Sequence, residues 1–141
     1  MPSADDFDFW LGTWDVRWGE HGQERGRNVI TRSFGGRVIQ EDFDGRPGTE
    51  LVGMSMTVFD EHRELWRQTW VDDSGNYFAL EGNFVDGEMV LLCDRHNGPA
   101  DTIYRMRWFD IGRTSLTWVW ERSSDGGTTF AELWRLAYER V

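Results

Sequence analysis

The segment Asp8–Trp18, with the sequence DFWLGTWDVRW, places three tryptophans within nine residues and a glycine between the first two. The residues before it predict a short helix over residues 4–10, because Ser3 can cap its start and acidic side chains occupy its first turn. Gly12 ends that helix, and the residues after it alternate between apolar and polar, which is the pattern of a strand with one buried face. The segment therefore predicts a helix followed by a strand whose tryptophans point inward.

The same alternation recurs along the rest of the chain and predicts nine further strands. Glycine-containing turns separate several of them, and Asp86-Gly87 has the composition of a type I′ hairpin turn. Successive hairpins form an antiparallel meander, and a meander that closes on itself leaves no exposed edge. We therefore predict an all-β fold, an antiparallel closed β-barrel of about ten strands with a short N-terminal helix, as a single domain over residues 1–141. The expected strands are 13–19, 26–34, 37–43, 50–59, 64–71, 76–84, 88–95, 102–109, 115–122 and 129–139.

The charge balance excludes several classes of partner. The 141 residues carry 15 basic and 25 acidic side chains, for a net charge of −10 and a pI near 4.7. Because the basic residues are scattered, we expect no nucleic-acid partner and no membrane partner, both of which require clustered positive charge. The N-terminus lacks the basic start and apolar run of a signal peptide, and the single cysteine, Cys93, allows no internal disulfide. We expect a cytoplasmic protein.

One face of most strands is rich in aromatic and methionine side chains once Trp14 is taken as inward. Barrels of this size hold side chains and one small ligand, and ligand pockets are mostly apolar with a few polar groups. The inward faces of the strands at 26–34, 37–43 and 88–95 are ambiguous. The residues that we expect to contact a ligand are Trp18, Met54, Met56, Trp66, Gln68, Trp70, Phe78, Tyr104, Met106, Trp118, Trp120, Arg122, Glu132 and Trp134.

Gly12-Thr13-Trp14 resembles the Gly-x-Trp signature of the calycin superfamily, which includes lipocalins, fatty-acid-binding proteins and nitrobindins. The resemblance implies that this tryptophan plugs the closed end of a calycin-like barrel against an arginine near the end of the last strand, here Arg140. The wider pattern is similar to a lipocalin-like family of uncharacterised bacterial proteins with no settled activity. It includes FDFWLGTW, GGRVIQEDFDG, Trp70-Val71-Asp72, and Asp125-Gly126-Gly127 followed by Trp134.

Glu132 is the most informative polar residue of the expected interior. Between Phe130 and Trp134 on an inward face, its carboxyl would be desolvated and its pKa would rise. Glu132 and Tyr104 are then the acid–base candidates if the protein is an enzyme. Two alternatives remain open: an ion pair between Glu132 and Arg122 on the neighbouring strand, and a register shifted by one residue that leaves Glu132 in solvent.

The sequence indicates no cofactor and no metal. His21 and His62 fall in expected loops, and no histidine follows His96. Nitrobindins bind haem through a histidine in the late strands, so the resemblance carries no haem site to this chain, and His96 is the one residual candidate. No spacing of histidine, cysteine and carboxylates matches a metal site, and no nucleophile elbow, P-loop or dinucleotide motif is present.

Three functions are compatible with these observations. The first is a protein that binds a small, largely apolar molecule, aromatic or polycyclic, in the barrel. The second is a cofactor-free cyclase or isomerase that acts on such a molecule in secondary metabolism. The third is a non-enzymatic interaction protein with a filled barrel. A homodimer through a barrel face is compatible with each of them, although no residue specifies one.

Overall fold

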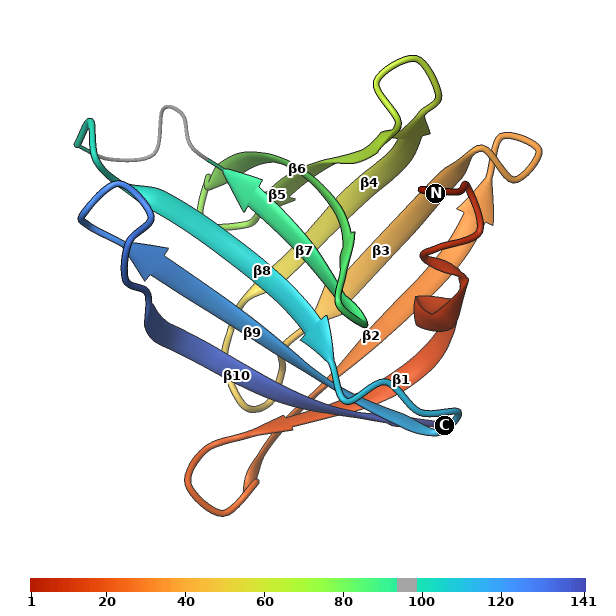
Figure 1. Cartoon of the computed structure of the whole chain (residues 1–141). Coiled ribbons are helices and arrows are strands. Elements are labelled where there is room, and N and C mark those ends of the chain that lie inside the picture. The colour runs from red at the N-terminus through yellow and green to blue at the C-terminus, as the bar shows by residue number, and fades with distance from the viewer. Residues whose placement is uncertain (94–98) are drawn as a thin grey trace.

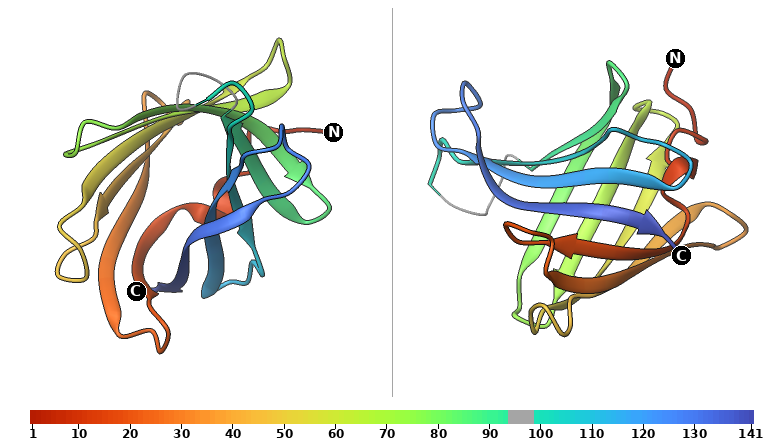
Figure 2. Two further views of the ribbon diagram at one scale, coloured as in Figure 1. Left: turned by 90° about the vertical axis from the view of Figure 1, so that its left-hand side faces the viewer. Right: turned by 90° about the horizontal axis from the view of Figure 1, so that it is seen from below.

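The protein is a closed antiparallel barrel, given by a computed structural model that describes residues 1–93 and 99–141 (Figure 1). Each strand pairs with its neighbours in chain order, and the first strand pairs with the last to close the ring (Figure 2). The predicted all-β, ten-stranded closed barrel is confirmed. The elements are η1 (Asp8–Trp10), β1 (Gly12–Trp18), β2 (Glu24–Ser33), β3 (Val38–Asp44), β4 (Val52–Asp60), β5 (Leu65–Asp72), β6 (Tyr77–Val85), β7 (Glu88–Cys93), β8 (Ile103–Phe109), β9 (Ser115–Ser123) and β10 (Ala131–Arg140).

The N-terminal helix is shorter than the sequence predicts. Turns lead into the 3-10 helix η1, and the Ser3 hydroxyl accepts a hydrogen bond from the Asp5 backbone N–H at 3.2 Å. Phe7 and Trp10 are fully buried, and each packs edge-on against Trp108, with ring centroids 5.0 and 5.2 Å apart. The segment therefore closes one end of the barrel with aromatic rings. No helix in the described part of the chain is long and apolar enough to cross a membrane.

Trp14 and Arg140 complete the closed end of the barrel. The guanidinium carbon lies 4.1 Å from the centroid of the tryptophan ring, a cation–π distance. The same guanidinium donates to the carbonyl oxygens of Leu11 and Phe9 at 2.6 and 3.2 Å, which ties the last strand to the N-terminal segment. Gly12 has a φ of +128°, and a β carbon there would collide with the Arg140 guanidinium. The expected tryptophan–arginine contact is confirmed.

The face of β4 is the reverse of the expected one. Gly53, Ser55 and Thr57 point into the barrel and are buried. Small residues are needed there because the Trp70 ring lies against Gly53 and the Glu41 carboxyl binds Ser55. The apolar residues of β4 face outward instead: Met54, Met56 and Val58 have exposed fractions of 38%, 52% and 39%. Placing the more hydrophobic face of β4 inward is therefore wrong.

A β-bulge changes the alternation along β10. The register of β10 against β9 shifts between Glu132 and Trp134, so Leu133 is an extra residue in the strand. Because of the bulge, Leu133 and Trp134 both line the cavity, with Leu133 at its exposed rim. Before the bulge, the alternation is inverted: Phe130 stacks on an arginine of β8 and Glu132 binds Arg135, at 2.8 Å, on the outer wall. The expectation that Glu132 faces the interior is therefore wrong.

Candidate functional site

The barrel encloses a cavity of about 340 Å³ that reaches the surface at the exposed residues Asn76 and Leu133. Its volume falls at the small end of the range for ligand pockets, about 300–1,000 Å³. The barrel interior is thus not filled by side chains, contrary to the third hypothesis. Sixteen residues line the cavity: Glu41, Phe43, Leu51, Trp70, Asp72, Asn76, Phe78, Tyr104, Met106, Trp108, Trp118, Trp120, Leu133, Trp134, Leu136 and Tyr138.

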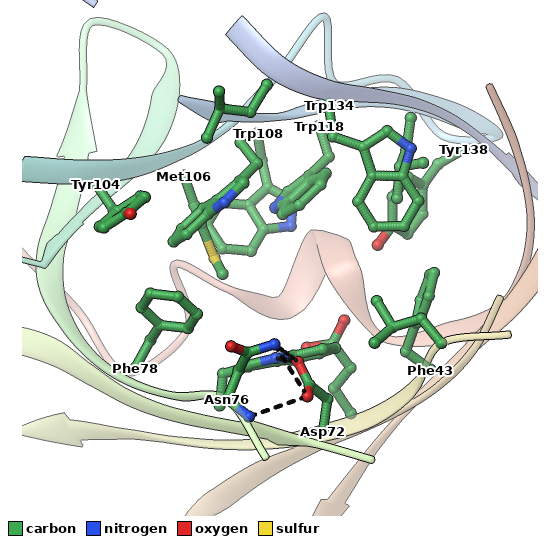
Figure 3. Close-up of a pocket in the computed structure, with 16 residues that line it drawn as sticks. Phe43, Asp72, Asn76, Phe78, Tyr104, Met106, Trp108, Trp118, Trp134 and Tyr138 are labelled. Carbon is green, nitrogen blue, oxygen red and sulfur yellow. Dashed lines mark hydrogen bonds between the residues drawn. The ribbon is translucent and has the colours of Figure 1, made fainter. Parts of the chain in front are cut away.

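Aromatic rings from opposite sides of the barrel form the walls of the cavity (Figure 3). On one side, Tyr104 and Trp120 stack in parallel with centroids 5.1 Å apart, and Phe78 packs edge-on against both at 5.3 and 5.0 Å. On the other side, Trp134 packs edge-on against Phe43 at 5.8 Å. Because the rings hold one another in place, the walls are preorganised for a flat apolar group.

A buried polar cluster adjoins the cavity, centred on Glu41 of β3. The Ser55 hydroxyl donates to Glu41 Oε1 at 2.7 Å, and the Asn28 amide donates to Glu41 Oε2 at 2.7 Å. The same amide nitrogen donates to the Tyr138 hydroxyl at 2.7 Å. Glu41 and Tyr138 both line the cavity, so the cluster presents a carboxyl and a phenol to whatever enters it.

Burial dominates the ionisation of this cluster. It raises the pKa of the Glu41 carboxyl from 4.5 to about 7, and the hydrogen bonds from Ser55 and Asn28 offset only part of the effect. The negative charge of Asp42, next along the strand, raises the pKa further. Burial and the Glu41 charge also raise the pKa of Tyr138 above its usual value, so this phenol stays protonated. At neutral pH, Glu41 can therefore both release and accept a proton.

A second carboxylate lies where the cavity meets the loop after β5. Asp72 accepts hydrogen bonds from the Trp70 indole at 2.9 Å and from the Asn76 side-chain amide at 3.1 Å (Figure 3). The backbone N–H of Ser74 adds another bond at 3.0 Å. Partial burial works against ionisation, but these bonds together hold the pKa of Asp72 below its usual value. The outer part of the cavity therefore carries a permanent negative charge.

Several buried polar atoms in the described part of the interior have no hydrogen-bond partner in the protein. Among them are the indole nitrogens of Trp66 and Trp108 and the side-chain oxygens of Gln68 and Asn28, and of these residues only Trp108 lines the cavity. Buried polar groups are nearly always hydrogen-bonded.

The structure brings together half of the residues that the sequence proposes as ligand contacts. Seven of the fourteen line the cavity: Trp70, Phe78, Tyr104, Met106, Trp118, Trp120 and Trp134. Three others point inward beside it: Trp66 packs on Phe7, Gln68 donates to Thr57, and Trp18 packs on Trp134.

Four of the proposed contacts lie outside the cavity. Met54 and Met56 are on the outer face of β4, because the buried positions between them are filled by small residues. Glu132 is on the outer wall because of the bulge, and it pairs with Arg135 rather than with Arg122. Arg122 is exposed at the end of β9 and is absent from the cavity lining. The expectation that Met54, Met56 and Glu132 face the interior is wrong, whereas Arg122 shares the inward face of β9 with Trp118 and Trp120 but lies beyond the cavity lining.

Sequence reasoning missed the polar cluster because the inward face of β3 was ambiguous. Ile39, Glu41 and Phe43 alternate, and all three are buried. A carboxylate between two inward apolar residues is the same signal that drew attention to Glu132, and here it identifies a buried group. Tyr138 follows Leu136 at the strand spacing of two, so the same alternation could have identified it as inward, although it was not among the expected contacts.

No protein-family model matches the chain, and no curated protein matches it. The closed barrel is consistent with a calycin-like fold. Within residues 1–93 and 99–141, no three histidine, cysteine or carboxylate side chains lie close enough together to hold a metal ion. His96, the residual haem candidate, falls outside the described residues. The cavity and its side chains are therefore the basis for a functional proposal.

Proposed function

We propose that this protein binds a small, largely apolar aromatic molecule in the barrel cavity. The observation that supports the proposal best is the preorganised aromatic lining of a cavity of about 340 Å³, with a few polar groups among the rings. Such a lining gives affinity through burial of apolar surface, and the polar groups fix orientation. A planar ligand of two or three fused rings matches the cavity in size and shape.

Two leucines allow a matched test of where binding occurs. Leu133 lines the cavity and is 44% exposed, whereas Leu92 lies on the outer wall of β7 and is 43% exposed. Leu133→Trp would obstruct the cavity, and Leu92→Trp makes the same change outside it. The binding of 1-naphthalenemethanol is measured by isothermal titration calorimetry. We expect saturable binding to the wild type, at least tenfold weaker binding to Leu133→Trp, and a change within twofold for Leu92→Trp.

The proposal has two clear points of failure. Equal binding to the wild type and Leu133→Trp would place the ligand elsewhere on the molecule. Absence of saturable binding to the wild type, with this alcohol and with the charged naphthyl compounds used below, would overturn cavity binding.

A proton-transfer reaction on the bound molecule is a second candidate function, favoured by the position of Glu41. An efficient general acid or base has a pKa near the working pH, and Glu41 combines a pKa of about 7 with a place in the cavity wall. For a ligand that the protein isomerises or cyclises, Glu41→Gln would abolish turnover and keep binding. Turnover that survives in Glu41→Gln would rule out this role.

A further inference from the structure

The charged side chains among the described cavity-lining residues are all acidic. Nine aromatic rings line the cavity together with Glu41 and Asp72, and no arginine or histidine is among the described lining residues. Aromatic faces attract cations, and cages of such rings recognise ammonium groups. We infer that the ligand carries a positively charged nitrogen on its aromatic framework, with Glu41 as the counter-ion. This inference rests on the proposed function, since it assigns a ligand class to the same cavity.

Glu41 has acceptor capacity that its protein neighbours do not use. A carboxylate offers about four acceptor sites, and each Glu41 oxygen receives one bond from a neutral donor, Ser55 or Asn28. Asn28 cannot supply more, because its amide nitrogen already donates both to Glu41 and to Tyr138. An ammonium N–H from the cavity would occupy a remaining site and would neutralise the buried charge.

Glu121 is a shielded carboxylate whose charge is balanced by arginines of the protein itself, and it can be compared with Glu41. Glu121 on the outer wall is 6% exposed and Glu41 is 7% exposed, although Glu41 lies deeper in the barrel and is more strongly desolvated. Arg105 and Arg107 donate to Glu121 at 2.8 and 2.9 Å, and these bonds keep its pKa below the usual value in spite of burial. Glu41 has no such cation in the described structure, so its charge is balanced either by a proton or by a cation on a bound molecule.

The same features disfavour the other charge classes. A ligand carboxylate would meet Glu41 at the polar cluster and Asp72 at the outer part of the cavity, and like charges repel in a poorly solvated site. A neutral ligand would leave only a proton to balance the charge of Glu41. Asp72 is already bound by Trp70 and Asn76, so it acts as a fixed negative charge that draws cations inward.

Three probes on one ring system isolate charge from shape: 1-naphthylmethylammonium, 1-naphthalenemethanol and 1-naphthoate. Their dissociation constants are measured by isothermal titration calorimetry at pH 7. We expect the cation to bind at least tenfold more tightly than the alcohol, and the carboxylate to bind most weakly. Glu41→Gln should reduce the cation-to-alcohol preference to below threefold. Asp42→Asn removes an equal charge from the outer face of the same strand and should keep the preference.

The outcomes separate the two proposals. If the alcohol binds as tightly as the cation, the cationic ligand class is overturned and cavity binding stands. If the preference survives in Glu41→Gln, the counter-ion is not Glu41. If no probe binds, the proposed function fails and this inference fails with it.

A measurement on the wild type keeps the inference testable even if Glu41→Gln does not fold. A cation that pairs with Glu41 displaces the proton held on it, so calorimetry in two buffers of different ionisation enthalpy should show proton release at pH 6 and much less at pH 8. The groups that face Glu41 do not mask this effect: β2 and β4 present neutral Asn28 and Ser55, and Tyr138 stays protonated. Binding of the cation without proton release at pH 6 would overturn the pairing.

Discussion

Replacing Glu41 with glutamine should change how the stability of the protein depends on pH. Burial raises the pKa of the Glu41 carboxyl from 4.5 to about 7 in the folded chain. Between these values the folded state holds a proton that the unfolded state has lost, so the free energy of unfolding falls as pH rises. Glutamine does not titrate. Its oxygen can accept from Asn28 and its amide can donate to the Ser55 hydroxyl, so the variant should fold.

The size of the effect follows from the pKa difference. Each pKa unit corresponds to about 1.36 kcal/mol, so the shift of Glu41 is worth about 3 kcal/mol in total, most of it between pH 5 and 7. We expect the free energy of unfolding of Glu41→Gln, relative to the wild type, to rise by about this amount from pH 4.5 to pH 8. Urea denaturation followed by tryptophan fluorescence at half-unit pH steps measures it.

Other carboxyls do not produce this signal. Asp44, Asp72 and Asp125 have lowered pKa values, so the stability that they contribute is lost only as pH falls below the usual range of an aspartate. Subtracting the curve of the variant from that of the wild type removes what they contribute at every pH. Parallel curves from pH 5 to pH 8 would refute the argument, because they would mean that Glu41 titrates alike in the folded and unfolded chains.

Two further pairs of variants test the packing and the charge network. Glu121→Gln should lower the free energy of unfolding by about 2 kcal/mol because it breaks a partly buried network with two arginines. Glu132→Gln removes one member of an exposed ion pair and should change the free energy of unfolding by less than about 0.5 kcal/mol. Urea denaturation at pH 7 measures both variants, and equal effects would contradict the placement of these residues. Gly53→Ala should lower the free energy of unfolding by about 1–3 kcal/mol because the added β carbon would collide with the Trp70 ring. Gly112→Ala has room for a methyl group and serves as the control. Thermal unfolding compares the two variants, and an unchanged stability of Gly53→Ala would show that the Trp70 ring can move aside.

The fold was predictable because its signals are local and repeated. The alternation of apolar residues marked ten strands, and Asp86-Gly87 forms the expected hairpin turn, with φ values of 53° and 83°. The Gly-x-Trp segment located the closed end, where Trp14 meets Arg140. Period-two alternation determines which residues share a face of the sheet. Closure of the barrel is then expected because an open sheet would leave two edge strands with unpaired backbone groups.

The cavity was less predictable, because it depends on which face of each strand points inward. In β4 the inward positions take small residues since neighbouring strands fill the space with Trp70 and Glu41, and no pattern within β4 reveals that. In β10 one extra residue, Leu133, inverts the alternation before it, so Glu132 faces outward. The buried carboxyl that lines the cavity is instead Glu41 on β3. Both errors arise from contacts between strands that are distant in sequence.

The ionised Glu41 carboxylate in the cavity wall lowers the stability of the fold. At pH 8 the ionised carboxyl lowers the free energy of unfolding by about 3 kcal/mol relative to its protonated form, a large fraction of the 5–15 kcal/mol that holds a typical domain together. The chain has fifteen basic residues, and two of them bind Glu121 on the outer wall, whereas none in the described structure binds Glu41. A cation bound beside Glu41 would restore the lost stability of the protein, but only while the cavity is occupied. An unpaired carboxylate among fixed aromatic rings therefore couples the stability of the barrel to what it contains, which a core residue selected for packing alone would not do.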